Sequence, residues 1–182
     1  NKFGFHAGFF IDIKINEIGK KLSKDKLFDK KKAVKRFCKY YDVLKDKSKN
    51  VSLYIENNVF SRNNRITYKN ETPFMMTNFN EYKALKNKID FNLLLDVAHL
   101  KVSAKTLGLN LEEEFINMMN VSKYIHISDN DANHDSNNEI TKSSNLLPLL
   151  KDSDTKDKDF TLEIYDGMNA ISNSYNTLSK VI

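Results

Sequence analysis

Four apolar runs in this sequence end in a side chain that can bind a metal ion or move a proton. The end residues are Glu56, Asp96, His126 and Glu163. Carboxylate oxygens and imidazole nitrogens are ligands for divalent ions of hard or borderline character. A charge at the end of a buried strand is costly unless another group compensates it. The pattern therefore predicts one shared metal site, and the alternative is that these are four ordinary polar strand ends.

The spacing of the four residues predicts the fold that would bring them together. They are 40, 30 and 37 positions apart, which fits one βα unit each, because a βαβ unit takes about 30 residues before long loops are added. In parallel sheets, sites form at the carboxyl ends of the strands. Ligands on successive strands favour a closed ring over an open sheet, so we expect an α/β fold of the (β/α) TIM-barrel type.

The hydrophobic pattern predicts strands that alternate with helices. Short apolar runs of β type are expected to form strands, and amphipathic stretches are expected to form helices. Residues 57–80, 97–108 and 129–144 are expected to be connections. The expected strands are 2–13 with its exit, 51–56, 91–96, 123–128 and 160–164, and the expected helices are 26–44, 81–89, 111–119, 145–151 and 168–182.

The number of expected strands is too small for a complete barrel. A (β/α) barrel has eight strands in about 250 residues, whereas this chain has five expected strands in 182 residues. The sequence also starts with Asn1 rather than Met and enters a strand at once. We therefore expect residues 1–182 to form a single barrel domain that is incomplete at its N-terminus or completed by a partner.

The composition excludes several classes of protein. With 40% hydrophobic and 11% aromatic residues, the chain is typical of a folded domain rather than a disordered one. No apolar run approaches the roughly 20 residues of a membrane span, and the first residues lack a signal-peptide pattern. The single cysteine, Cys38, indicates a thiol in a reducing compartment. These features predict a cytoplasmic domain without a membrane partner, and they leave homo-oligomers open.

Positive charge is concentrated in one stretch. The net charge is +5, and between Lys20 and Lys49 there are 12 Lys and one Arg against four Asp. Such a stretch is compatible with nucleic-acid binding. Its charges are nearly all Lys and lie opposite an apolar helical stripe, and Arg, which recognises phosphate better, is almost absent. A solvated helix face is therefore the favoured interpretation.

Four short motifs surround the strand ends. They are Tyr54-Ile55-Glu56-Asn57, Leu94-Leu95-Asp96-Val97-Ala98-His99, Ile125-His126-Ile127-Ser128-Asp129-Asn130-Asp131 and Thr161-Leu162-Glu163-Ile164-Tyr165. In this order, and at the spacing of βα units, they resemble successive motifs of the xylose-isomerase-like barrel superfamily. That superfamily includes sugar isomerases, ketose epimerases and apurinic-site endonucleases. The resemblance extends over most of the chain.

The resemblance implies one divalent ion, which could be Mn²⁺, Mg²⁺, Co²⁺ or Zn²⁺. The ligands that it implies are Glu56, Asp96, His126 and Glu163. In the isomerase and epimerase branch, the metal polarises the substrate as a Lewis acid, and two Glu residues move a proton to and from carbon. By that analogy, Glu56 and Glu163 are the catalytic pair.

The resemblance also gives roles to residues near the four ligands. His99 matches the histidine of the family's Asp-x-x-His motif, which contacts substrate or supports the site. His6 matches a histidine that ligates a further metal in the endonucleases. Asp129 and Asp135 follow the third motif, and they are expected to be turn residues, substrate contacts or hydrogen-bond partners of His126.

One departure from the endonuclease pattern favours sugar chemistry. The endonucleases carry an Asp-x-His motif where this chain has Asp135-Ser136-Asn137, and a carboxamide is a poor zinc ligand. We therefore predict a metal-dependent isomerase or epimerase whose partner is a small carbohydrate, a sugar or a sugar phosphate. The alternatives are a metal-dependent phosphodiesterase at abasic DNA sites, and a non-catalytic degenerate barrel that serves as a binding module.

Overall fold

The computed structural model describes residues 1–14, 17 and 22–182. Lys20 and Lys21, which begin the basic stretch, lie outside the described residues. Strands and helices alternate along most of the described chain, as predicted. In chain order the elements are β1 (Lys2–His6), α1 (Lys30–Lys47), β2 (Ser52–Glu56), α2 (Arg62–Thr67), α3 (Phe79–Lys86), β3 (Asn92–Asp96), α4 (Val97–Leu107), α5 (Leu111–Val121), β4 (Ser122–Ile127), α6 (Leu146–Lys151), β5 (Asp159–Leu162) and α7 (Met168–Leu178).

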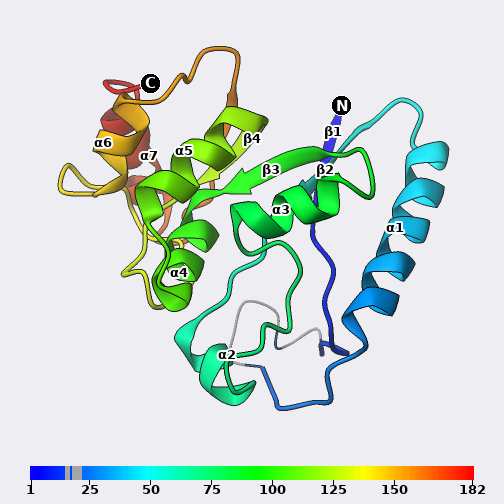
Figure 1. Cartoon of the computed structure of the whole chain (residues 1–182). Helices are drawn as coiled ribbons and strands as arrows, with labels where there is room; N and C mark the ends of the chain where they lie inside the picture. The colour runs from blue at the N-terminus through cyan, green and yellow to red at the C-terminus, as the bar shows by residue number, and fades with distance from the viewer. Residues whose placement is uncertain (15–16, 18–21) are drawn as a thin grey trace.

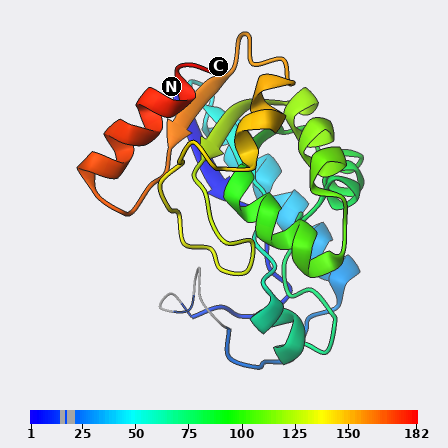
Figure 2. The ribbon, with the colours of Figure 1, turned by 90° about the vertical axis from the view of Figure 1, so that its left-hand side faces the viewer.

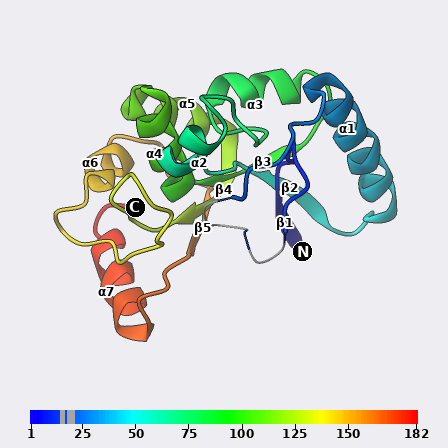
Figure 3. The same cartoon turned by 90° about the horizontal axis from the view of Figure 1, so that it is seen from below.

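The five strands form one open sheet rather than a barrel. All neighbouring strands are parallel and follow the order β1-β2-β3-β4-β5. The prediction of a TIM-type barrel is therefore wrong, because β1 and β5 are the two edges of this sheet and do not pair with each other. Five strands are too few to close a ring whose interior is filled by side chains, which takes about eight. The sheet curves into a half-barrel, with helices along its outer side (Figures 1 and 3).

The two faces of the sheet have different roles because successive side chains in a strand point to opposite faces. Ile55, Leu95 and Ile125 are fully buried on the outer face and belong to the main hydrophobic core, together with residues of α3 and α5. Each such side chain contributes about 1.5–3 kcal/mol relative to an exposed one. The alternate positions, including Glu56 and Asp96, belong to the concave inner face.

An irregularity in the β3–β4 pairing keeps the polar strand ends on the same face. The register shifts between Leu93 and Leu94, after which Leu94 lies opposite Tyr124 and Asp96 lies opposite His126. A shift of one residue reverses the face to which side chains point. The irregularity therefore decides that His126 shares the inner face with Asp96.

Helix α4 lies in a segment, 97–108, that was expected to be a connection. Its N-cap is Asp96, whose carboxylate accepts a hydrogen bond from the backbone N–H of His99 at 2.7 Å. Its C-cap is Gly108, in the left-handed conformation that favours glycine. The cap links the end of β3 directly to the first turn of α4, and it fixes His99 one turn beyond Asp96.

The expected loop 57–80 likewise contains the short helix α2, capped by Ser61. Helix α5 is capped by Asn110, whose side chain accepts hydrogen bonds from the backbone N–H groups of Glu112 and Glu113. Both chain ends lie at the end of the molecule opposite α2 (Figure 2). None of the described helices is long and apolar enough to cross a membrane.

Side chains from the two edge strands meet across the concave face. The Lys2 ammonium pairs with the Asp159 carboxylate and lies 5.8 and 5.3 Å from the ring centres of Tyr54 and Tyr124. The Tyr124 ring in turn packs edge-on against His126, with ring centres 5.3 Å apart. These side chains line the concave face below the strand ends, and Tyr124 supports the His126 ring.

Candidate metal centre

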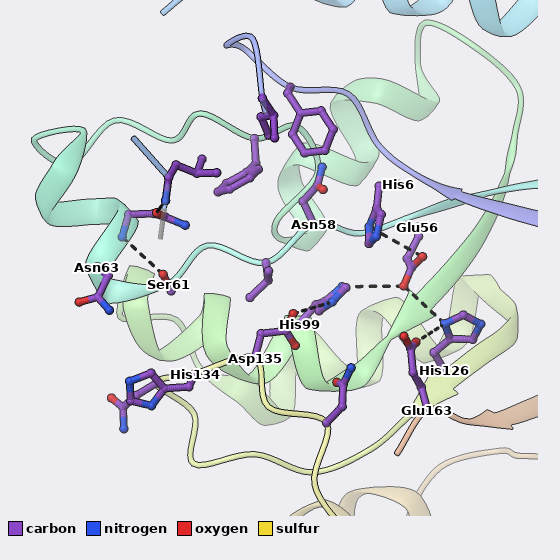
Figure 4. A pocket seen from close by; sticks show the side chains of 18 of the residues that line it. His6, Glu56, Asn58, Ser61, Asn63, His99, His126, His134, Asp135 and Glu163 are labelled. Carbon is purple, nitrogen blue, oxygen red and sulfur yellow. Dashed lines mark hydrogen bonds and ion pairs between the residues drawn. The ribbon is translucent and has the colours of Figure 1, made fainter. Parts of the chain in front are cut away.

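The structure brings the four predicted ligands together. One ligand atom from each of Glu56, Asp96, His126 and Glu163 lies within 4.8 Å of the corresponding atoms of the others. The residues come from the ends of β2, β3 and β4 and from the position that follows β5. Figure 4 shows the side chains of Glu56, His126 and Glu163 directed toward one another. The four side chains therefore converge at one edge of the sheet, and their role as metal ligands stays a prediction.

Two atoms in the group have polar neighbours but no hydrogen bond. The Nδ1 atom of His126 lies 2.8 Å from Glu163 Oε2 and 3.5 Å from Glu56 Oε1. Nevertheless, this atom and the Oδ2 atom of Asp96 are buried without a hydrogen-bond partner of acceptable geometry among the described residues. Unsatisfied buried polar atoms are costly. A cation between these atoms would satisfy them, so the donor set fits a divalent ion.

The charges of the group also favour a cation. Burial raises the pKa of Asp96 to about 6, because its carboxylate has little access to water. Burial alone would lower the pKa of His126, but the adjacent Glu163 and Glu56 carboxylates override it and raise that pKa to about 10. The neighbouring His126 ring lowers the pKa of Glu163 to about 2. The carboxylates thus hold a proton on His126, which a metal ion can replace.

A second group of potential ligands shares Glu56. His6, Glu56 and His99 also offer atoms within 4.8 Å of one another. The His99 Nδ1 atom lies 2.8 Å from the Asn57 carbonyl oxygen and therefore donates its proton there. Its Nε2 atom then lies 3.3 Å from Asp135 Oδ2. Burial acts to lower the pKa of His99, but nearby carboxylates raise it well above its usual value, so His99 is a cationic partner of Asp135.

The remaining predicted residue, Asp129, does not join the site. Its carboxylate bonds to the ammonium group of the buried Lys101, and it lines a separate polar cavity of about 310 Å³. Asp135, by contrast, lines the main pocket and has one buried oxygen, Oδ1, without a partner among the described residues. Of the two predicted aspartates, Asp129 and Asp135, the structure therefore places only Asp135 beside the centre, in the lining of the main pocket.

Two asparagines that no sequence pattern indicated hold the site together. Asn57 is fully buried, and its side chain donates to the Asp96 carbonyl oxygen at 3.0 Å and accepts from the Asp96 N–H at 2.8 Å. The next residue, Asn58, donates from its side chain to the carbonyl oxygens of Ala7 and Met75. The only local signal was their place directly after Glu56, at the carboxyl end of a strand.

A cavity of about 470 Å³ lies beside the centre (Figure 4). This volume is in the usual range for small-molecule sites, about 300–1,000 Å³. Tyr165, which is 72% exposed, donates from its hydroxyl group to Glu163 Oε1 at 2.9 Å at the rim. The lining comprises His6, Phe9, Ile13, Leu22, Glu56, Asn58, Val59, Ser61, Asn63, Asn64, Phe74, His99, His126, Asn133, His134, Asp135, Asn137, Glu163 and Tyr165.

Comparisons with known proteins support the fold. No protein-family model matches the sequence, and no curated protein matches it. Among solved structures, the chain is similar to the apo form of the 3-keto-D-glucoside 4-epimerase YcjR from E. coli, with a TM-score of 0.52 and 11% identity. About half of that epimerase shares this fold. The match covers 82% of this chain and 53% of the epimerase chain, and at this identity it concerns the fold alone.

Proposed function

We propose that this chain belongs to the xylose-isomerase-like superfamily and acts as a metal-dependent isomerase or epimerase on a carbohydrate. The observation that carries the proposal is the convergence of Glu56, Asp96, His126 and Glu163 beside a cavity of small-molecule size. The fold shared with part of a sugar epimerase supports the same class of reaction.

Each ligand contributes to holding one divalent ion. Asp96 offers the unpaired Oδ2 atom, and His126 offers Nδ1, with its ring supported by Tyr124. Glu56 and Glu163 each offer a carboxylate oxygen close to that nitrogen. When bound, the ion supplies Lewis-acid polarisation of a carbonyl and hydroxyl pair, which acidifies the adjacent C–H bond.

The two glutamates then transfer the proton. The low pKa of Glu163 keeps its carboxylate ionised at neutral pH, so it can accept the proton as the C–H bond breaks. Glu56 reaches the same centre from β2, two strands away from β4, and can deliver a proton to carbon from another direction. Removal of one proton by Glu163 and delivery of a second proton by Glu56 from the other side inverts a carbon centre without net oxidation or reduction.

Solvent exchange at carbon tests this proposal. Protein loaded with Mn²⁺ is incubated in D₂O with D-fructose and D-allulose, and loss of the C–H signal is followed by NMR. Glu56→Gln and Glu163→Gln should each slow exchange by about 10²-fold or more, with unchanged circular dichroism. The matched control is Glu112→Gln, at an exposed position of α5, which should exchange like the wild type. Full exchange in both site variants would refute the assigned roles.

The second candidate is a metal-dependent phosphodiesterase at abasic DNA sites. The second group of potential ligands, His6, Glu56 and His99, favours it, because these side chains offer atoms for a further metal ion once His99 releases the proton that it shares with Asp135. Against it stands Asn137, which occupies the place of the histidine in the endonuclease Asp-x-His motif. Asn137 is buried, and its side-chain oxygen accepts a hydrogen bond from the Ser128 hydroxyl at 3.0 Å, so that oxygen is already occupied within the loop. One metal ion per chain favours the sugar enzyme and three favour the nuclease, whereas metal binding without any turnover favours a binding module.

A further inference from the structure

The wall of the pocket contains an amide whose orientation is fixed. Asn58 is 3% exposed, and its side-chain nitrogen donates to the carbonyl oxygens of Ala7 at 2.9 Å and Met75 at 2.8 Å. If the Asn58 amide were rotated by half a turn, its oxygen would face two carbonyl oxygens, and no hydrogen bond could form between them. The side-chain oxygen of Asn58, to which none of the described residues donates, is therefore the atom available to a ligand. It is a hydrogen-bond acceptor only.

The charge around this acceptor is negative even with a metal ion in place. Glu56, Asp96 and Glu163 bring three carboxylates to the centre, and one divalent ion does not neutralise all three. Asp135 adds a further carboxylate to the lining, but the cationic His99 beside it balances that charge, so the excess negative charge comes from the three carboxylates of the centre. A phosphate group carries about −1.5 to −2 charges near neutral pH and offers mainly acceptor oxygens. Both its charge and its hydrogen-bonding character are therefore disfavoured here.

Apart from His134, which pairs with the Asp131 carboxylate at 2.9 Å, the side chains that line the wall away from the metal centre are uncharged (Figure 4). Phe9 and Phe74 line it with their rings 5.8 Å apart in an edge-to-face arrangement. Ser61 and Asn63 lie on the side of the pocket far from His126 (Figure 4). Aromatic surface combined with a few hydroxyl and amide groups is typical of pockets for uncharged small molecules. A sugar ring, with apolar C–H faces and hydroxyl groups at its edge, matches this wall.

We infer that the pocket takes a neutral, polyhydroxylated ligand, an unphosphorylated sugar or glycoside, and discriminates against the phosphate ester of the same sugar. The Asn58 oxygen accepts a hydrogen bond from one of the ligand's hydroxyl groups. The inference rests on the proposed function and narrows its substrate class.

Paired titrations test the inference. D-Fructose and D-fructose 6-phosphate are titrated into the Mn²⁺-loaded protein at low ionic strength, where charge effects are least screened. The phosphate ester should bind at least about tenfold more weakly than the free sugar. Equal or tighter binding of the ester overturns the inference and leaves the proposed function standing. If neither compound binds although the protein holds Mn²⁺, both the inference and the proposed function are overturned.

A variant with added charge tests the neutral wall itself. Asn63→Lys places a cation beside the pocket, and Asn173→Lys is its control. Both asparagines are exposed helix residues whose carbonyl oxygen accepts a threonine hydroxyl at 2.9 Å, from Thr67 and Thr177 respectively. Asn63→Lys should shift the ratio of the two affinities several-fold toward D-fructose 6-phosphate and away from D-fructose, whereas Asn173→Lys should leave that ratio unchanged. Equal behaviour of the two variants contradicts the inference.

Discussion

Replacement of Asn57 by Ala should separate the end of β2 from the end of β3. Asn57 is fully buried, and its side chain satisfies both the backbone N–H and the backbone carbonyl of Asp96. Alanine can do neither. The change therefore leaves two backbone groups without partners at the point where Asp96 enters the proposed metal centre.

The expected cost follows from these two bonds. A buried polar group that loses its partner costs about 1–3 kcal/mol, so the two together should cost about 2–6 kcal/mol. This is a large share of the roughly 5–15 kcal/mol that stabilises a typical domain. With a urea dependence of about 2 kcal/mol per molar, the unfolding midpoint should fall by about 1–3 M.

Urea unfolding followed by circular dichroism measures this loss, and Asn92→Ala is the matched control. Asn92 joins the same two strands, with a side chain that donates to the Leu53 carbonyl oxygen at 3.1 Å, but it is exposed. Its replacement should cost less than about 1 kcal/mol, because water can take over the single bond. If Asn57→Ala were no more destabilising than Asn92→Ala, the two hydrogen bonds between the Asn57 side chain and the Asp96 backbone would not be what holds these strand ends together.

Three further outcomes follow. Since the pKa of His126 is raised from 6.5 to about 10, its pairing stabilises the metal-free protein fully below pH 6.5 and is lost as pH rises through 10, so the urea midpoint should fall over that range. Lys101→Met leaves the Asp129 carboxylate, whose side chain is only 15% exposed, without its cation. This change should cost about 3–5 kcal/mol of unfolding free energy. Tyr165→Phe removes a hydrogen bond that lowers the pKa of Glu163. The pKa of Glu163 should therefore rise, and the acidic limb of the pH–rate profile should shift to higher pH while the urea midpoint stays unchanged.

The sequence was sufficient to predict which strand-end side chains converge because that signal is local. Glu56, Asp96 and His126 each end an apolar run, and the carboxyl ends of parallel strands share one edge of the sheet. The position of each of these side chains could therefore be predicted from its own run. The closed barrel was wrong because ligands on successive strands fix their order but not whether the edge strands meet.

Other features depend on distant partners and left no local pattern. Helix α4 is buried at nine of its 11 positions, so it shows no amphipathic stripe to distinguish it from an apolar connection. The role of Asn57 depends on backbone atoms of Asp96, 39 residues further along the chain. The separation of Asp129 from Asp135 likewise depends on Lys101 of α4. Only the folded structure reveals these contacts.

Calorimetric titration with Mn²⁺ tests the central claim most directly. The wild-type chain should bind one Mn²⁺ ion at the centre formed by Glu56, Asp96, His126 and Glu163. Asp96→Asn and His126→Gln should each weaken binding by at least about tenfold, because each removes a ligand, while Glu112→Gln should bind like the wild type. Absence of Mn²⁺ binding in the wild type, or equal affinity in all four proteins, would contradict the account.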